Sequence, residues 1–378
     1  MDRRSIIKNA IPVMILSLIT ACLLCIQISI AKQTKSTLPY AIELRSERGL
    51  NLNFDEISEF LDNATGVSVS KAMISSELST QNISVNLRAT DGNYAQIMPV
   101  DIIRGNYFFI EPSPLQNEFV VISDKLAVKF FRSEDVVGKS ITVNGETHSI
   151  CGVYRSDEAI MSRISSNGLD TVYLPYKSIS EYEKLPIHML YVKKQTKFID
   201  SVVDEITQKL GKQPMPDTMS NYNDSNTIIG QAPKITLFFV GILTIITLIW
   251  IMVPHIAKAY RFYKGDDKKS ALIHMGIVFV CIVVALFLLK LVLFHLYLPA
   301  SILPNDNILD LKHYFELIVQ AINKRNGFLL YDYYWNYSFV AMRFGMITAT
   351  LSVVTLLVTW ICGAFLAKHI LEGNECEE

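Results

Sequence analysis

The sequence predicts an α-helical membrane protein with four transmembrane helices and one α+β extracytoplasmic domain, in which two strand–helix units flank a β-rich insertion. Half of the 378 residues are apolar, and most of them gather in four long blocks. A run of about 20 apolar residues is long enough to cross a bilayer as a helix. Roughly 200 residues of mixed composition separate the first block from the second, and that length is enough for a domain with its own core.

The four apolar blocks divide the chain into membrane and aqueous segments. We expect transmembrane helices at residues 11–31, 235–256, 273–298 and 340–367. The remaining segments are an N-terminal tail (1–10), the large domain (32–234), two loops (257–272 and 299–339) and a C-terminal tail (368–378).

The distribution of basic residues predicts the orientation of these helices. Lysine and arginine concentrate in the N-terminal tail, in the 257–272 loop and just after the fourth block: Arg3, Arg4, Lys8, Lys258, Arg261, Lys264, Lys268, Lys269 and Lys368. Short loops rich in lysine and arginine stay in the cytoplasm. We therefore expect both tails and the 257–272 loop on the cytoplasmic side, and the 32–234 domain and the 299–339 loop outside.

Within the large domain, the spacing of apolar residues predicts two strand–helix units. The first joins a strand at 38–46, a helix at 53–66 and a strand at 67–75. The second joins a strand at 188–194 to a helix at 197–210, where apolar residues recur at helical spacing. The segments between these units alternate apolar and polar residues and include the hairpin-turn sequence VNGE, so we expect a β-rich insertion there.

The sequence carries no pattern typical of a catalytic, metal or nucleotide site. The segment SEDVVGKS, 133–140, has Ser133 where a phosphate-binding loop needs glycine. Cys151 is the only cysteine of the large domain, so we expect no disulfide within it, and no cysteine and histidine spacing suggests zinc. We therefore expect no enzyme activity, no metal and no cofactor in this chain. The net charge of −1 gives no indication of a nucleic-acid partner.

Three segments of the large domain carry an ordered set of motifs: DGNYAQIMPVDIIRGNYF (91–108), NEFVVISDKLAVKFF (117–131) and VVGKSITVNGETHSICGVYR (136–155). With one apolar block before them and three after, they resemble the MacB-like permeases of ABC systems, a group that includes FtsX-type proteins. The resemblance implies that five positions maintain the scaffold of the domain: Tyr94, Arg104, Gly105, Gly138 and Gly152. Glycine suits tight turns and left-handed backbone, and we expect such backbone at Gly105 and Gly138.

The resemblance also implies a function. It indicates the membrane (permease) subunit of an ABC-type exporter or mechanotransmission complex in the inner or plasma membrane of a bacterium. A separate cytoplasmic ABC ATPase subunit would bind ATP, and its motion would pass through the helices to the outer domain. The other implied partners are a second permease copy or a paralogue, and membrane lipids. The alternative is a membrane-anchored sensor or scaffold with a ligand-binding outer domain and no ATPase.

The 257–272 loop departs from the family pattern where the ATPase contact is expected. The Glu-Ile-Gly core of the pattern is missing, while the basic character remains and Tyr260, Arg261 and Phe262 are candidate contacts. Three explanations stay open. These residues contact a diverged ATPase, the chain is a passive partner of a second permease, or the basic residues only anchor the helices at the anionic leaflet.

The 299–339 loop is longer than a minimal connection. Its apolar residues recur three or four positions apart and predict an amphipathic helix: Ile308, Leu311, Phe315, Ile318 and Ile322. The aromatic segment 328–339, just before the fourth block, is typical of an interfacial belt. Binding of a lipid or an amphipathic peptide is the alternative for that segment.

Overall fold

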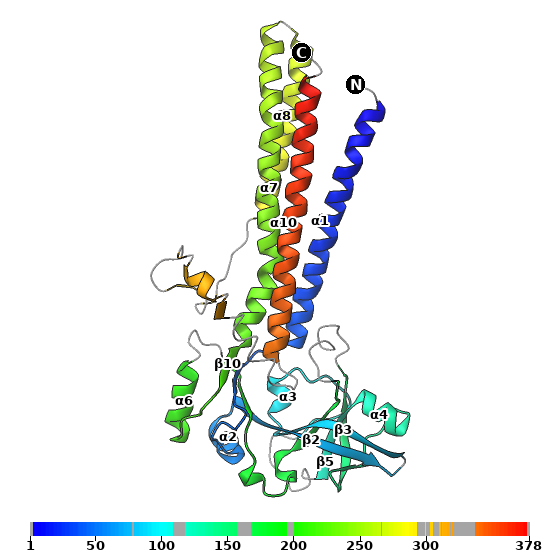
Figure 1. Cartoon of the computed structure of the whole chain (residues 1–378), viewed down its shortest axis with the longest axis vertical. Coiled ribbons are helices and arrows are strands. Elements are labelled where there is room, and N and C mark those ends of the chain that lie inside the picture. Colours follow the sequence, from blue (N-terminus) through cyan, green and yellow to red (C-terminus); the bar gives the residue numbers. More distant parts are fainter. Residues whose placement is uncertain are drawn as a thin grey trace. The chain divides into compact units, whose positions relative to one another are not determined.

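A computed structural model describes residues 3–77, 79–108, 118–156, 168–194, 200–265, 267–292, 299, 303–304, 310, 312–317, 319–320 and 337–375. The chain forms two compact units (Figure 1). The helical unit comprises Met1–Gln33, Ile228–Tyr297 and Gly345–Glu378. The second unit, here called the domain, comprises Thr34–Thr227 and Leu298–Phe344.

In the described part of the chain, four helices are long and apolar enough to cross a membrane: α1 (Arg3–Thr37), α7 (Tyr222–Lys264), α8 (Lys268–Val292) and α10 (Tyr337–Glu375). They confirm the predicted class, a membrane protein with four spanning helices. Helices α1, α7 and α10 are longer than the predicted spans, and α8 begins before the predicted residue 273, because hydropathy marks the apolar part of a helix and not its ends. The end of α1 and the starts of α7 and α10 belong to the domain.

Helices α7 and α8 form a tight hairpin. Helix α7 continues to Lys264 and α8 begins at Lys268, so most of the 257–272 segment is helical. The Asp267 carboxylate accepts hydrogen bonds from the Ser270 backbone N–H (3.3 Å) and hydroxyl (2.7 Å), which caps the start of α8. The imidazoles of His255 and His274 contact each other across the hairpin, with Nδ1 atoms 3.0 Å apart.

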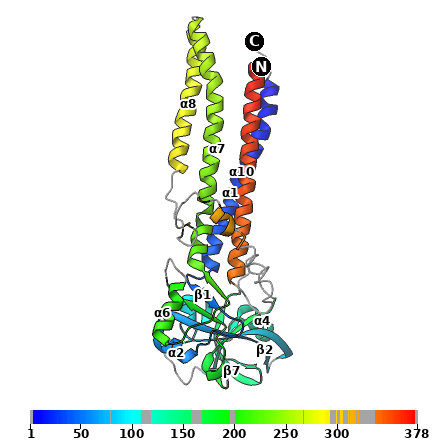
Figure 2. The ribbon, with the colours of Figure 1, turned by 60° about the vertical axis from the view of Figure 1, so that its left-hand side comes forward.

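Within the helical unit, α10 contacts both α1 and α7. Gln27 Nε2 of α1 donates to Thr355 Oγ1 of α10 at 3.3 Å. The hydroxyls of Thr236 on α7 and Ser352 on α10 are 2.8 Å apart. Figure 2 shows α1 beside α10 and α8 beside α7. Since a bilayer offers no hydrogen-bonding partners, these polar contacts help to hold α1, α7 and α10 together.

The domain is built on a mixed sheet. Its described strands are β1 (Ile42–Arg45), β2 (Ala64–Ser76), β3 (Ser79–Thr90), β4 (Ile102–Gly105), β5 (Phe119–Ser123), β6 (Ser140–Val143), β7 (Glu146–Tyr154), β8 (Thr171–Pro175), β9 (Met189–Val192) and β10 (Thr218–Asn221). Their order is β10-β1-β9-β2-β3-β8-β5-β7-β4, and β6 pairs with β2 and β7. Most pairs are antiparallel, while β3–β8 and β5–β7 are parallel.

The two predicted strand–helix units are confirmed, and they are interleaved. Strand β1, helix α2 (Phe54–Phe60) and β2 form the first, and β9, α6 (Asp200–Leu210) and β10 form the second. Strand β9 lies between β1 and β2 and is antiparallel to both, while β10 pairs with the other edge of β1. Helix α2 is shorter than the predicted helix at 53–66, because β2 already begins at Ala64 and pairs with β9.

Two hydrophobic clusters form the core of the domain. One gathers apolar side chains of α2, α6, β1 and β9: Leu44, Phe54, Ile57, Leu190 and Ile206 are among its members. The other belongs to the β-rich insertion and packs helix α4 (Asp124–Phe131) against the sheet through Ile74, Ile122, Leu126 and Val172. The insertion also contains helix α3 (Tyr94–Ile97) and is followed by short helical turns at Tyr176–Ser178 and Tyr182–Lys184. The insertion therefore has a core of its own.

The 299–339 segment is described only in part. Residues 312–317 and 319–320 are helical. Most of the predicted amphipathic helix positions (Ile308, Leu311, Ile318 and Ile322) and the aromatic residues 328–336 lie outside the described residues. The amphipathic helix therefore stays a prediction.

Candidate functional site

The domain contains the residues at which three of the long helices end or begin. Helix α1 ends at Thr37, α7 begins at Tyr222 and α10 begins at Tyr337, and all three residues belong to the domain. The side chains around these three residues hold the helix ends within the domain. We call the group of Tyr191, Tyr222, Asn226 and Tyr337 the junction.

Asn226 ties the start of α7 to the chain that leaves α1. Its side-chain Nδ2 donates to the backbone carbonyls of Leu38 (3.5 Å) and Pro39 (3.3 Å). One turn earlier, the backbone N–H of Tyr222 donates to Ala41 O at 3.1 Å. Asn226 is 2% exposed, so water cannot replace these bonds without opening the packing. The ends of α1 and α7 are therefore held together inside the domain.

Tyr337 places the first turn of α10 against the same elements. Its ring packs edge-on against Tyr191 of β9 (centroids 6.4 Å apart, 88° between planes) and against Tyr222 of α7 (6.1 Å, 67°). All three rings are buried. Edge-to-face packing of aromatic rings stabilises a contact by about 0.5–1.5 kcal/mol beyond the burial of area. The first residues of α7 and α10 thus contact each other, and Tyr337 also contacts the sheet.

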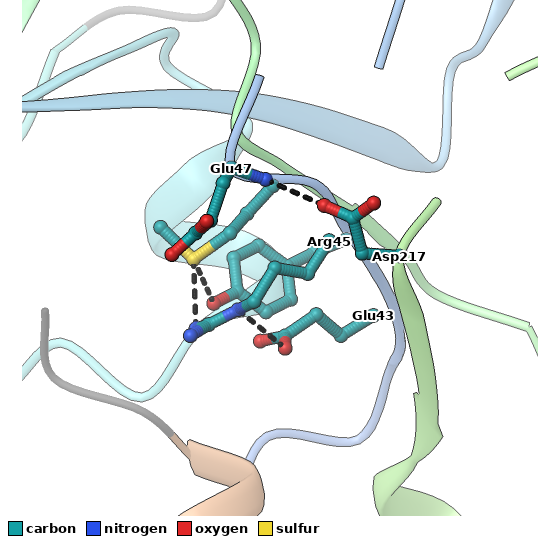
Figure 3. A network of polar contacts seen from close by, with 6 residues as sticks. Glu43, Arg45, Glu47 and Asp217 are labelled. Carbon is teal, nitrogen blue, oxygen red and sulfur yellow. Dashed lines mark hydrogen bonds and ion pairs between the residues drawn. The ribbon is translucent and has the colours of Figure 1, made fainter. Parts of the chain in front are cut away.

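Arg45 and Glu43 form an ion pair in the interior, and their side chains point toward one another (Figure 3). Arg45 Nε lies 3.1 Å from Glu43 Oε1, and the two side chains are 4% and 1% exposed. Arg45 Nη2 donates to Met189 Sδ (3.1 Å), which also accepts from the Tyr191 hydroxyl (3.3 Å). Burial disfavours the charged guanidinium, yet Glu43 offsets this and the pKa of Arg45 lies above its ordinary value. A charged Arg45 on β1 is therefore linked, through Met189, to the tyrosine that contacts α10.

A second buried arginine, Arg88 of β3, lies among tyrosines. Its Nη1 donates to the Tyr94 hydroxyl at 2.9 Å. The Tyr94 ring stacks on Tyr107 (6.1 Å, 23°) and packs edge-on against Tyr191 (6.4 Å, 75°). Burial raises the pKa of Tyr107 and of Tyr191 well above the ordinary value, so both hydroxyls stay neutral. These rings form a continuous path from the junction to the β-rich insertion.

Asp91 follows β3 and fixes the start of α3. Its Oδ1 accepts hydrogen bonds from Thr65 Oγ1 (2.7 Å) and from the Asn93 backbone N–H (3.1 Å). Burial raises the pKa of Asp91 from 3.8 to about 6, because the charged carboxylate loses its water. This carboxyl group therefore titrates in mildly acidic conditions while it holds Tyr94 in place.

The five scaffold positions have different surroundings. Tyr94 is fully buried in the tyrosine cluster, whereas Arg104 is exposed on β4 and its Nη1 donates to the neighbouring Ile103 carbonyl (3.0 Å). Gly105 (φ +67°) and Gly138 (φ +85°) have left-handed backbone. A Cβ on Gly105 would lie 2.1 Å from Cys151 O, and one on Gly152 would lie 2.3 Å from Asn106 O. The glycines at 105 and 152 therefore allow β4 and β7 to approach closely.

We expect Gly105→Ala to destabilise the domain by about 1–3 kcal/mol more than Gly138→Ala, because overpacking adds to the backbone strain only at Gly105. Both glycines have positive φ, but a Cβ on Gly138 would have no atom within 4 Å. The free energy of unfolding of the domain is measured for the two purified variants in urea, with pulse proteolysis as the readout of the folded fraction. The difference between the two values tests the prediction. Equal losses of stability would mean that backbone strain alone requires glycine at both positions.

The three candidate ATPase contacts lie in the last turns of α7 and differ in exposure. Tyr260 is 68% exposed and Arg261 is also exposed. The Phe262 ring stacks on His274 of α8 (5.5 Å, 7°), so part of it is used to hold the hairpin. Sequence reasoning missed Tyr263, which is 70% exposed, although its spacing of three from Tyr260 predicts a shared helix face. Tyr260 and Tyr263 are thus an exposed aromatic pair near the hairpin.

Sequence reasoning also missed the junction. Tyr337 is 7% exposed and packs against Tyr191 and Tyr222, so its prediction as part of an interfacial belt is wrong. Periodicity carries no signal for such contacts, since the three tyrosines come from distant segments. Within the described residues, no three or more His, Cys, Asp and Glu side chains are grouped as metal ligands would be.

The chain is similar to known proteins chiefly through the domain. Residues 21–209, half of the chain, match the family model of the MacB-like periplasmic core domain. The solved periplasmic region of MacB from Actinobacillus actinomycetemcomitans has a TM-score of 0.40 and 14% identity, covering 52% of this chain and 94% of that one. The extracellular domain of the ABC-type transporter YknZ from Gram-positive bacteria has a TM-score of 0.34 and 16% identity. The match covers 47% of this chain and 99% of that one.

These structural similarities are too low to carry an argument of their own. A search of curated proteins finds no match. The family match, by contrast, covers half of the chain, and the strand–helix units and spanning helices described above accompany it. The chain therefore belongs to the MacB-like family of ABC transporter permeases, as a multi-pass membrane protein with the periplasmic core domain after its first spanning helix.

Proposed function

We propose that this chain is the permease subunit of an ABC-type exporter or mechanotransmission complex and that it couples a separate cytoplasmic ATPase to motion of its core domain. ATP is bound by the partner ATPase, and this chain holds no cofactor of its own. A second permease copy or a paralogue completes the membrane part. The family supports the general role, and the junction supports the coupling.

The junction is the observation that carries the proposal. Tyr222 and Tyr337 are the first residues of α7 and α10, and Tyr337 also contacts Tyr191 of the sheet. Buried side chains pack at crystal-like density, so one ring cannot move without moving its neighbours. A change in the relative position of α7 and α10 therefore displaces β9, which lies between the two strands β1 and β2.

We place the core domain outside the cell membrane of a bacterium and both chain ends in the cytoplasm, because the basic residues cluster on one side of the helices. Ser180 is exposed on the domain and Lys269 is exposed on the α7–α8 hairpin. In a chain without native cysteines, we expect a membrane-impermeant maleimide to label Ser180→Cys in intact cells and to label Lys269→Cys only after lysis. The reverse pattern would overturn this orientation.

The ATPase contact is placed at the α7–α8 hairpin. Tyr260, Arg261 and Tyr263 offer an exposed aromatic and basic surface there, and exposed tyrosine and arginine are typical of protein interfaces. Phe262 takes part differently, because it stacks on His274 and stabilises the hairpin itself. The hairpin departs from the family pattern, so we expect a partner ATPase with a correspondingly diverged surface.

We expect a pull-down of the tagged chain from native membranes, in the presence of ATP, to recover an ATPase with an intact phosphate-binding loop. Replacing Tyr260 and Tyr263 together with alanine should lower that recovery by tenfold or more, since interface hot spots contribute about 2 kcal/mol or more. The matched control is Tyr40→Ala, an exposed tyrosine (51%) of the domain. Recovery of a differently tagged copy of the chain, or of a paralogue, reports the second permease.

The outcomes separate the candidate roles. An ATPase that is retained by Tyr40→Ala and lost with the hairpin variant supports the proposal. A wild-type chain that consistently recovers no ATPase contradicts it and favours the sensor or scaffold, in which the domain binds a ligand without ATP. An ATPase that binds the wild type and the hairpin variant equally well moves the contact away from Tyr260 and Tyr263.

A further inference from the structure

Helices α7 and α10 contact each other twice in the same residue register. The Thr236 and Ser352 hydroxyls are 2.8 Å apart, and a Cβ on Gly363 would lie 2.6 Å from Thr247 Oγ1. In both pairs the α10 residue is 116 positions after the α7 residue. The two contacts are 11 residues apart on each helix, which is three helical turns. The helices therefore run parallel, with one face of each in repeated contact, and we call this the seam.

The α10 face of the seam carries a row of hydroxyls. Their positions follow one side of the helix at spacings of three and four: Thr348, Ser352, Thr355 and Thr359. Thr348 is 2% exposed, and Thr236 of α7 is 1% exposed. Gly363 follows Thr359 by four residues and continues the row without a side chain. On this face of α10, Thr348 therefore lies one turn before Ser352, and Thr359 lies one turn before Gly363.

Each hydroxyl of the seam has one proton, which it donates either across the seam or to a carbonyl of its own helix. Thr236 bonds the carbonyl four residues earlier at 2.9 Å, and Ser352 and Thr247 do the same at 2.9 Å each. The Thr359 hydroxyl donates to the Thr355 backbone carbonyl at 2.8 Å. In a bilayer an unsatisfied donor is costly, but these donors keep a partner when α7 and α10 separate. The contacts across the seam can therefore break without leaving a donor unpaired.

Sliding α10 by one turn toward its own C-terminus brings new hydroxyls into the same places. Thr236 would then face Thr348, and Thr247 would face Thr359. A slide in the opposite direction would bring Leu356 to Thr236 and an alanine, at 367, to Thr247. One turn is 3.6 residues, so the opposite slide also brings Thr355 near Thr236, but positions 366 and 367 near Thr247 are both apolar. Both pairs are therefore polar in one direction only. Packed helices change place in steps of one turn, about 5.4 Å, because intermediate positions clash.

The contacts of α1 with α10 are of a different kind. Gln27 is fully buried, and its Nε2 donates to Thr355 Oγ1 at 3.3 Å. Within the described residues the Oε1 of Gln27 has no hydrogen-bond partner, so this amide depends on the bond from its Nε2 to Thr355. Losing it would leave a whole amide without a partner in apolar surroundings, which is expensive. We therefore expect α1 to move together with α10, and such a move requires the bonds of Asn226 to Leu38 and Pro39 to open.

We propose that the seam has two registers: the one observed, and a second in which α10 and α1 have moved by one turn along α7 toward the C-terminus of α10. Gly363 favours the observed register, because only glycine allows Thr247 to approach so closely. The inference deepens the proposed function, since this step would carry motion from the ATPase to the junction.

Disulfide cross-linking in native membranes tests the two registers. In a chain without its native cysteines, Thr236→Cys is combined in turn with Ser352→Cys, Thr348→Cys or Leu356→Cys. The last two positions are each one turn from Ser352, so Leu356 is a matched control for thermal sliding. We expect the 236–348 pair to cross-link about threefold faster than the 236–356 pair, the order expected for the one interhelical hydrogen bond, Thr247–Thr359, that these cysteines leave in place. Equal rates for these two pairs would overturn the proposal.

A glycine pair gives a second, independent measurement. Gly363→Ala should increase 236–348 cross-linking relative to 236–352, because its Cβ disfavours the observed register. Gly345→Ala, on the same helix, is the control, since a Cβ there would have no atom within 4 Å. An unchanged ratio in Gly363→Ala would contradict the role of this glycine in the register.

Nucleotide separates this inference from the proposed function. An increase of 236–348 cross-linking with ATP and vanadate supports both. A preference for 348 over 356 in membranes from which no ATPase can be recovered supports two registers and contradicts ATP coupling. A recovered ATPase with equal 348 and 356 rates supports the coupling and overturns the two registers.

Discussion

Replacing Arg45 with methionine is expected to destabilise the domain by about 3–5 kcal/mol, because the change leaves a buried carboxylate without its partner. Glu43 is 1% exposed and its Oε1 lies 3.1 Å from Arg45 Nε, so no water can take the place of the guanidinium. Methionine has a similar length and keeps much of the packing. The free energy of unfolding of the domain, from pulse proteolysis in urea, measures the loss.

Two further variants separate the unpaired charge from other causes. Arg155→Met removes an ion pair with Asp101 (3.3 Å) in which both side chains are about two-thirds exposed (66% and 70%), so we expect a loss of less than about 1 kcal/mol. Arg45→Met combined with Glu43→Leu removes both buried charges and should recover most of the stability. If the double variant stays as unstable as Arg45→Met, the loss comes from packing or from the Met189 contact, and the unpaired charge is not its cause.

The fold of the domain could be predicted where a local pattern decides it. The strand–helix units follow from apolar spacing, and α6 at Asp200–Leu210 matches the expected 197–210 closely. The helix expected at 53–66 ends at Phe60, because pairing of β2 with β9 takes the chain from Ala64 onward. Such pairing depends on a strand more than a hundred residues away, so a local pattern cannot locate it.

The membrane part shows the limit of hydropathy. The four apolar blocks predict the four long helices, but polarity alone indicates a loop at 257–272. That segment is largely helical, since it contains good helix formers and no glycine before Gly265. Polar residues mark where a helix leaves the bilayer and do not mark where it ends.

The candidate site could be predicted least. The family resemblance indicates Tyr94 as a scaffold position, and Tyr94 lies among the tyrosines that lead to the junction. Tyr191, Tyr222 and Tyr337 come from a strand and from the starts of two helices, so no spacing in the sequence relates them. Arg45 also reads as an ordinary charged residue on a short strand, and only its burial beside Glu43 indicates a structural role.

Asp91 is expected to make the domain less stable as the pH rises from about 4 to about 6. The folded pKa of Asp91 is about 6, and its ordinary value is 3.8, so the folded state binds the proton more tightly than the unfolded state. Its contribution to stability is therefore complete below pH 4 and is lost as the pH rises through the folded pKa. The shift corresponds to about 3 kcal/mol as an order of magnitude.

Asp91→Asn isolates this contribution. An asparagine oxygen can still accept from Thr65 and from the Asn93 backbone N–H, while the charge is gone. Relative to the wild type, the variant should gain about 3 kcal/mol of unfolding free energy between pH 4 and pH 7. Asp101→Asn, at an exposed carboxylate (70%), controls for the general loss of one negative charge. Parallel pH profiles of wild type and Asp91→Asn would mean that the carboxyl group reaches water in the folded domain, and that the start of α3 opens without unfolding.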